Sequence, residues 1–188
     1  MKKQINPERK LYTLCLLVQD TAGVLSQVSR LFSRKGYNIE SIVSGATDKP
    51  GITRISIELA ADGLMIDQIA AQCRKLLPVK AVKIFDEESC IRREIALIKV
   101  RTADRAARDE IMQIINIFRA QVIDVDRECL TVWVFGAQSK NAALISMLAD
   151  FGILEIAKTG TIAIERGRST IYDASKLKEE YEYGKNVL

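Results

Sequence analysis

The chain has 188 residues, of which 48% are hydrophobic and 28% are charged, so it can bury one good core or two small ones. Its 28 basic and 24 acidic residues leave a net charge of +4, and charge alone therefore gives little support to nucleic-acid or membrane-surface binding. Because the chain contains no histidine, a Ser-His-Asp triad, a Cys-His pair and a histidine-containing zinc site are excluded within one chain.

The first predicted elements are a strand, a tight turn and an amphipathic helix. Residues 11–18 are apolar and rich in strand-forming side chains, and residues 20–23, Asp-Thr-Ala-Gly, can turn the chain. The next apolar residues have the spacing of one helical face: Val24, Leu25, Val28, Leu31 and Phe32. Gly36 is expected to end this helix in the left-handed conformation.

A hairpin, a second helix and a fourth strand are expected next. Residues 37–46 and 52–60 have the pattern of strands, and Pro50-Gly51 suits the central positions of a type II turn between them. Apolar residues within 64–77 follow a helical stripe, and residues 79–85 are a predicted strand. The predicted order is β-α-β-β-α-β.

The second half of the chain repeats this order. Strands are expected at residues 94–101, 122–126, 130–135 and 154–164, with helices at 106–119 and 141–151. The sequence therefore predicts an α+β protein of two tandem ferredoxin-like βαββαβ domains, each an antiparallel sheet with two helices on one face. The expected division is an N-terminal extension at 1–10, a first domain at 11–85, a linker at 86–93, a C-terminal domain at 94–167, and a charged tail at 168–188 that forms an exposed helix or a frayed end.

No part of the sequence indicates export or membrane insertion. The N-terminus lacks an apolar segment, and no stretch approaches the ~20 apolar residues of a membrane helix. The four cysteines are far apart, without a CxxC pair, and indicate reduced thiols: Cys15, Cys73, Cys90 and Cys129. A soluble, cytoplasmic chain without a metal site is expected.

The turn at residues 20–23 and the helix start behind it are a candidate binding site. Gly23 has no Cβ, so a ligand can approach its backbone closely. The amides around Gly23, Val24 and Leu25 have no partner within the helix and carry the positive end of its dipole, which suits a carboxylate. Such turns more often only connect two elements. Asn38 offers donors and an acceptor to a free amino acid, but it could equally cap the turn before it.

Other sequence patterns give weaker support for a catalytic or ligand-binding role. Asp124 and Asp126 alternate along a predicted strand and resemble a pair of catalytic carboxylates, but without a nearby base or cofactor motif an exposed strand face explains them better. Trp133 is better explained by packing on a sheet than by stacking on a ligand. The basic residues near Arg30 and Arg34 suggest a DNA-binding sensor, yet a solvated helix face accounts for them as simply and no helix-turn-helix signature accompanies them.

Three runs of sequence resemble those of one known family. They are GVLSQVSRLFSRKGYNIES at residues 23–41, RREIALIKV at residues 92–100 and FRAQVIDV at residues 118–125. Together, and in the right order over residues 11–166, they are similar to the small regulatory subunit of acetohydroxyacid synthase, also called acetolactate synthase.

This resemblance implies a fold and a function. The first domain would be an ACT domain and the second a ferredoxin-like C-terminal domain, neither of them catalytic. The chain would form a homodimer by joining ACT sheets side by side, bind valine or another branched-chain amino acid at that junction, and activate a separate large subunit carrying thiamine diphosphate, magnesium and FAD. No cofactor is expected in this chain, and no nucleic-acid or membrane partner. The alternative is a free-standing ACT-domain sensor that acts on another protein or on DNA.

The resemblance also assigns effector contacts. One protomer would supply Asp20, Gly23, Val24 and Leu25 from the turn and helix start, and its neighbour would supply Asn38 and Ile39 from a strand. Ser26 matches a position associated with the feedback response. Asp20 stands where the family more usually has Asn, and an acid there can pair with the ammonium of an effector or cap the turn.

Overall fold

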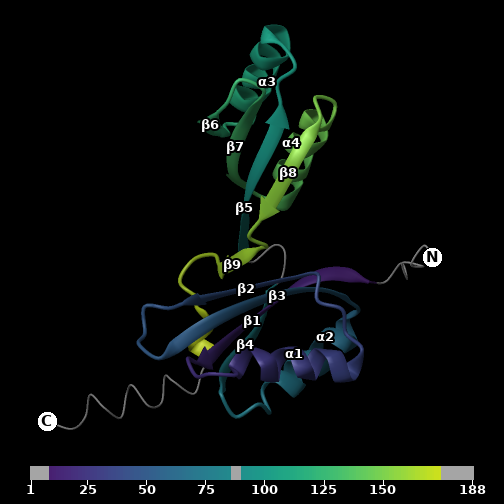
Figure 1. Cartoon of the computed structure of the whole chain (residues 1–188). Coiled ribbons are helices and arrows are strands. Elements are labelled where there is room, and N and C mark those ends of the chain that lie inside the picture. Colours follow the sequence, from purple (N-terminus) through teal and green to yellow (C-terminus); the bar gives the residue numbers. More distant parts are fainter. Residues whose placement is uncertain (1–8, 86–89, 175–188) are drawn as a thin grey trace, which may run out of the picture. The chain divides into compact units, whose positions relative to one another are not determined.

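The computed structural model describes residues 9–85 and 90–174, which form two compact units (Figure 1). The first contains the described residues of Met1–Ile91 together with those of Ile162–Leu188, and the second contains Arg92–Thr161. No helix within these described ranges is long and apolar enough to cross a membrane.

The first unit contains a four-stranded antiparallel sheet with the strand order β2-β3-β1-β4. Its elements are β1 (Lys10–Gln19), α1 (Val24–Lys35), β2 (Ser41–Ala46), β3 (Ile52–Ala61), α2 (Gly63–Cys73) and β4 (Val79–Phe85). The βαββαβ order predicted for this half is confirmed, and β2 is an edge of the sheet. Gly36 ends α1 with φ 70°, as predicted, and its amide donates to the last turn of the helix.

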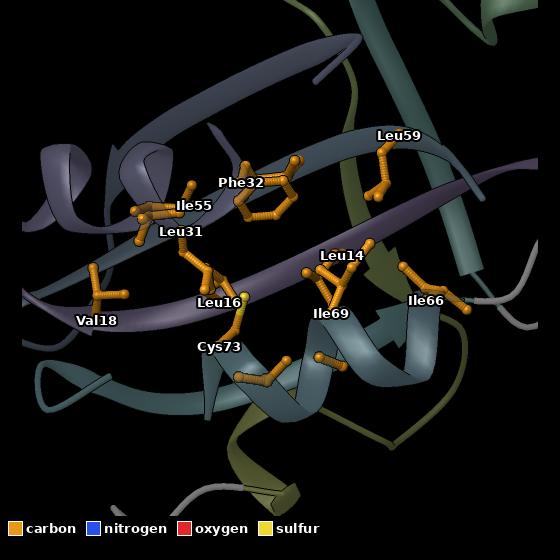
Figure 2. Close-up of a cluster of buried hydrophobic side chains, with 14 of the residues drawn as sticks. Leu14, Leu16, Val18, Leu31, Phe32, Ile55, Leu59, Ile66, Ile69 and Cys73 are labelled. Atoms are coloured by element: carbon orange, nitrogen blue, oxygen red, sulfur yellow. The ribbon is translucent and has the colours of Figure 1, made fainter. Parts of the chain in front are cut away.

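The core of the first unit lies between its sheet and its two helices. Side chains alternate between the two faces of a strand, and Leu14, Leu16 and Val18 of β1 point to the side of α1 and α2 (Figure 2). There they pack with Phe32 of α1 and Ile69 of α2. Burying a leucine side chain completely, as at Leu14 and Leu16, contributes roughly 1.5–3 kcal/mol.

The second unit repeats the arrangement. Its elements are β5 (Cys90–Arg101), α3 (Arg105–Ile117), β6 (Gln121–Val125), β7 (Cys129–Gly136), α4 (Gln138–Ala149) and β8 (Ile153–Lys158). The strands have the order β6-β7-β5-β8, and Ile98 and Val132 pack with Ile111 of α3 and Leu144 of α4. The α+β prediction of two tandem ferredoxin-like folds is therefore confirmed.

The prediction of a single strand at residues 154–164 is wrong, because these residues form two strands. β8 ends at Lys158, and Gly160 has φ 78°, a left-handed conformation that interrupts the extended chain. The Thr159 side chain stabilises this break by accepting from the Ile95 amide at 3.1 Å and donating to the Gly160 carbonyl at 2.8 Å. The next strand, β9 (Ile162–Glu165), pairs with β5.

Residues 162–174, here called the return segment, pack on the side of the first sheet opposite its helices. Ala163 in β9 and Ile171 in the short 3-10 helix η1 (Ile171–Ala174) join a second apolar cluster with Cys15 and Leu17 of β1. Three polar contacts add to this packing: Arg54 donates to the Ala163 carbonyl, Lys83 pairs with Glu165, and the Tyr172 hydroxyl donates to Asp48 at 2.8 Å.

The compact units therefore divide the chain differently from the predicted domains. The prediction assigned residues 162–167 to the second domain and residues 168–174 to an exposed tail, but both sets pack with the first unit. The predicted linker at 86–93 is shorter, since β5 begins at Cys90, and residues 86–89 lie outside the described residues. The same holds for residues 175–188 of the predicted tail and for residues 1–8 of the predicted extension.

Candidate functional site

The start of α1 leaves backbone donors unused. Gly23 is the residue before the helix, with φ 83° and ψ 0°, and no side chain caps the helix there. The Val24 amide donates weakly to the Thr21 carbonyl at 3.3 Å, whereas the amides of Gly23, Leu25 and Ser26 donate to no other residue in the described part of the chain. Free amides at the positive end of a helix dipole form a seat for an anion such as a carboxylate.

Backbone hydrogen bonds hold the turn before α1 in place. The Asp20 amide donates to the Gly51 carbonyl at 2.8 Å, which ties the turn to the β2–β3 hairpin. Gly51 has φ 74° and the Ile52 amide donates to the Lys49 carbonyl, so the type II turn predicted for Pro50-Gly51 is confirmed. The Asp20 side chain is exposed and does not cap α1, so its carboxylate stays available to a ligand.

Asn38 and Ile39 lie in the segment before β2, because β2 begins at Ser41 and not at residue 37 as predicted. The Asn38 side-chain amide donates to the Glu40 carboxylate at 2.6 Å, and the Glu40 backbone amide donates to the Glu58 carbonyl at 2.8 Å. This contact directs the Asn38 NH2 group toward Glu40 and leaves its side-chain oxygen free to accept a hydrogen bond. The sequence-based prediction missed Glu40; the Asn-x-Glu spacing was its only signal.

The other predicted contacts differ in exposure. Leu25 is 44% exposed and Ser26 is exposed, whereas Val24 is buried in the core and can offer only its backbone. Ile39 is half-buried against the same core. Within one described chain, no hydrogen bond joins the turn at residues 20–26 to Asn38 or Ile39.

Two of the other helix starts are closed by aspartates. Asp62 accepts from the Met65 amide at the start of α2, at 2.7 Å, and Asp104 accepts from the Ala107 amide at the start of α3, at 2.8 Å. A side-chain cap of this kind occupies the donors that an anion would use. The equivalent strand-to-helix turns of the two units, before α1 and before α3, therefore differ: only the first is open.

The edge strand β2 is exposed and lacks the residues that discourage pairing with another strand. Its sequence, SIVSGA, contains neither a charged residue nor a proline, and Ile42 is 38% exposed. The opposite edge, β4, carries Lys80 and Lys83 and follows Pro78. Lysine and proline are the residues that discourage edge pairing, so β2 is the edge better suited to pair with another strand.

The remaining candidates show no catalytic arrangement. Asp124 lies in β6, whereas Asp126 lies in the turn after it, where its carboxylate accepts from the Glu128 amide at 3.0 Å. The two carboxylates therefore do not alternate along one strand, as the paired-carboxylate interpretation required. Trp133 is half-buried on β7 opposite Leu97, which fits packing on the sheet. Among the described residues no group of three His, Cys, Asp or Glu side chains could hold a metal ion.

The cysteines separate into buried and accessible thiols. Cys15, Cys73 and Cys90 are buried, and only Cys129 is partly exposed. Burial raises the pKa of the Cys15 thiol, and it raises the pKa of Cys73 to about 12. The thiolate is the reactive form, so these two thiols should be inert near neutral pH.

Gly23→Ala is expected to lower the free energy of unfolding by about 1 kcal/mol, because an L residue at φ 83° is strained although no protein atom lies within 4 Å of the added Cβ. Urea unfolding of the two proteins measures the difference. Gly63→Ala is the matched control, since Gly63 also lies at a helix start with open space around it but without a positive φ. Equal effects of the two substitutions would show that the backbone at Gly23 is not strained.

Comparison with known proteins covers both halves of the chain. A family model described as "AHAS small subunit-like ACT domain" matches residues 14–80, and one described as "Small subunit of acetolactate synthase" matches residues 93–167. The acetolactate synthase small subunit of Mycobacterium bovis is 44% identical over 158 residues, which cover 84% of this chain and 94% of that protein. A probable acetolactate synthase small subunit of Methanothermobacter thermautotrophicus is 38% identical over 167 residues, covering 89% and 99%.

A solved structure gives the same result for the fold. The crystal structure of the acetolactate synthase small subunit from Thermotoga maritima superimposes with a TM-score of 0.79 at 38% sequence identity. The superposition covers 85% of this chain and 99% of that one.

Proposed function

Because the chain belongs to the acetolactate synthase small-subunit family and is thus a regulatory subunit with an ACT domain, we propose that it activates the large catalytic subunit and makes it sensitive to feedback by branched-chain amino acids, chiefly valine. The reaction would take place on the large subunit, a thiamine-diphosphate-dependent transferase that carries thiamine diphosphate, magnesium and FAD. The small subunit would hold none of these and would act in the cytoplasm.

The observation that carries this proposal is the open start of α1. An amino-acid effector would place its carboxylate against the free amides of Gly23, Leu25 and Ser26. The exposed Leu25 side chain would contact the branched aliphatic group. Asp20, exposed and not used as a helix cap, would attract the ammonium group.

Dimerisation through β2 would complete the site. Two copies of this unprotected edge can pair side by side into one continuous sheet, and a two-fold axis brings the same elements of both protomers together. Asn38 and Ile39 lie directly before β2, so the partner would offer them near the junction. The Asn38 side-chain oxygen, which the contact of the NH2 group with Glu40 leaves free, would accept from the effector's ammonium.

Feedback then follows from linkage. An effector shifts the holoenzyme between states of different activity only if it binds one state more tightly, and the coupling is reciprocal. We therefore expect valine to bind the free small subunit and the inhibited holoenzyme with different affinities. Typical couplings of this kind change an affinity by about 5-fold to 150-fold.

Reconstitution with the large subunit tests the proposal. The purified chain alone should form no acetolactate, its addition should raise the activity of the large subunit, and valine should reduce this stimulation. Valine added to the large subunit alone is the control and should have little effect. Unchanged large-subunit activity under every effector condition would refute the regulatory role, and valine binding without such a change would favour a free-standing sensor.

A further inference from the structure

A cavity lies in the second unit, far in sequence from the turn before α1. It has a volume of about 460 Å³ and is formed by the end of β5, the turn between β6 and β7, and the start of β8. Pockets that hold small molecules have volumes of roughly 300–1,000 Å³. The cavity is therefore large enough for a ligand of the size of an amino acid.

Hydrogen bonds between separate elements fix the walls of this cavity. The Thr102 amide donates to the Glu128 carbonyl at 2.7 Å, and Thr102 is only 4% exposed. The Arg108 guanidinium of α3 donates to the carbonyls of Asp126 and Arg127 at 2.7 and 2.9 Å, which holds the β6–β7 turn in place. A wall that is already ordered loses little conformational entropy when a ligand binds.

Three charged residues line the cavity: Arg101 at the end of β5, and Asp126 and Glu128 in the turn between β6 and β7. The Asp126 carboxylate accepts from the Glu128 amide at 3.0 Å. Arg101 and Glu128 are both exposed. Within residues 9–85 and 90–174, the Arg101 guanidinium and the Glu128 carboxylate form no ion pair or side-chain hydrogen bond, with each other or with another residue. Leu154, 49% exposed, adds an apolar wall beside the partly exposed Cys129.

We propose that this cavity is a second amino-acid site, which takes a zwitterionic α-amino acid with an aliphatic side chain. Arg101 binds the carboxylate through its planar fork of donors, Glu128 accepts from the ammonium group, and Leu154 contacts the side chain. The chemistry differs from that of the α1 site, because Asp104 already closes the start of α3 and a guanidinium takes the place of backbone amides. A guanidinium on one wall and carboxylates on another favour a zwitterion over a simple anion or cation.

Cys129 provides a direct test, because it lines the cavity and is the accessible thiol among the four cysteines. Its rate of alkylation by iodoacetamide would be measured in the full-length chain with increasing valine, leucine or isoleucine. At least one of the three should slow the reaction several-fold in the wild type, and equally in Asn38→Ala. In Arg101→Gln and in Glu128→Gln, the amino-acid concentration that gives the same protection should be at least about tenfold higher than in the wild type.

Two kinds of control isolate the proposed contacts. 4-Methylpentanoate and 3-methylbutylamine are leucine without its ammonium and without its carboxylate, respectively, and neither should protect Cys129. Arg105→Gln and Glu110→Gln remove the same charges from exposed positions on α3 outside the cavity, and protection should be unchanged. Circular dichroism confirms that each variant is folded.

Two results would overturn the proposal. One is an alkylation rate in the wild type that none of the three amino acids changes. The other is protection that is lost in Asn38→Ala and retained in Arg101→Gln, because the amino acid would then act from the α1 site alone. Neither result bears on stimulation of the large subunit, so this proposal and the proposed function can fail separately.

Discussion

Ile171→Ala is expected to lower the free energy of unfolding by about 2–5 kcal/mol. Ile171 is only 3% exposed and packs on the first sheet with Cys15, Leu17 and Phe85. Truncation removes three buried carbon atoms and leaves a cavity, because the sheet on one side of it cannot close onto the return segment. Urea unfolding, followed with a probe in the first unit, measures the loss.

Ile164→Ala is the matched control for this prediction. The substitution is the same and lies in the same return segment, but Ile164 is 58% exposed, so the change should stay below about 0.5 kcal/mol. A similar small effect of both substitutions would mean that residues 162–174 do not pack on the sheet in solution.

The path of the return segment is a part of the fold that local sequence patterns could not predict. Residues 153–158 and 162–165 both have the composition of strands, and only three residues separate them. Gly160 was the one local signal of a break. Which sheet β9 and η1 cover depends on contacts with β1 and β4, more than seventy residues earlier, and no local periodicity contains that information.

Local sequence patterns likewise predicted only part of the candidate site at the start of α1. Gly23 and Gly36 stand where the α1 backbone needs a left-handed residue, so composition and helical spacing were sufficient to place both ends of that helix. The position of Asn38 before β2, and its contact with Glu40, depend on where the β2–β3 pairing begins. Strand pairing likewise forms the cavity of the second unit, because the register of β5 and β7 brings Arg101 opposite Cys129, next to Glu128.

Asn38→Ala is expected to weaken the binding of valine by about tenfold to a hundredfold, because a hydrogen bond to a charged group is worth roughly 1.5–3 kcal/mol. The fold should be unaffected, since the Asn38 side chain is exposed and its one hydrogen bond is to the exposed Glu40. Calorimetric titration of valine, leucine and isoleucine into both proteins measures the change. Asn116→Ala, at an exposed position on α3, is the control and should bind like the wild type. Identical titrations of the wild type and Asn38→Ala with all three amino acids would refute the assignment of this site.

Mixed dimers test whether one effector site contains residues of two protomers. Gly23→Val should abolish binding, because a β-branched residue is strained at φ 83° and its side chain fills the space that the effector needs. In a dimer of one Asn38→Ala chain and one Gly23→Val chain, a shared site combines the intact Gly23 of the first with the intact Asn38 of the second. Random pairing of equal amounts should therefore restore about a quarter of the sites. If Gly23 and Asn38 of the same chain formed the site, every site in the mixture would remain defective and no binding would return.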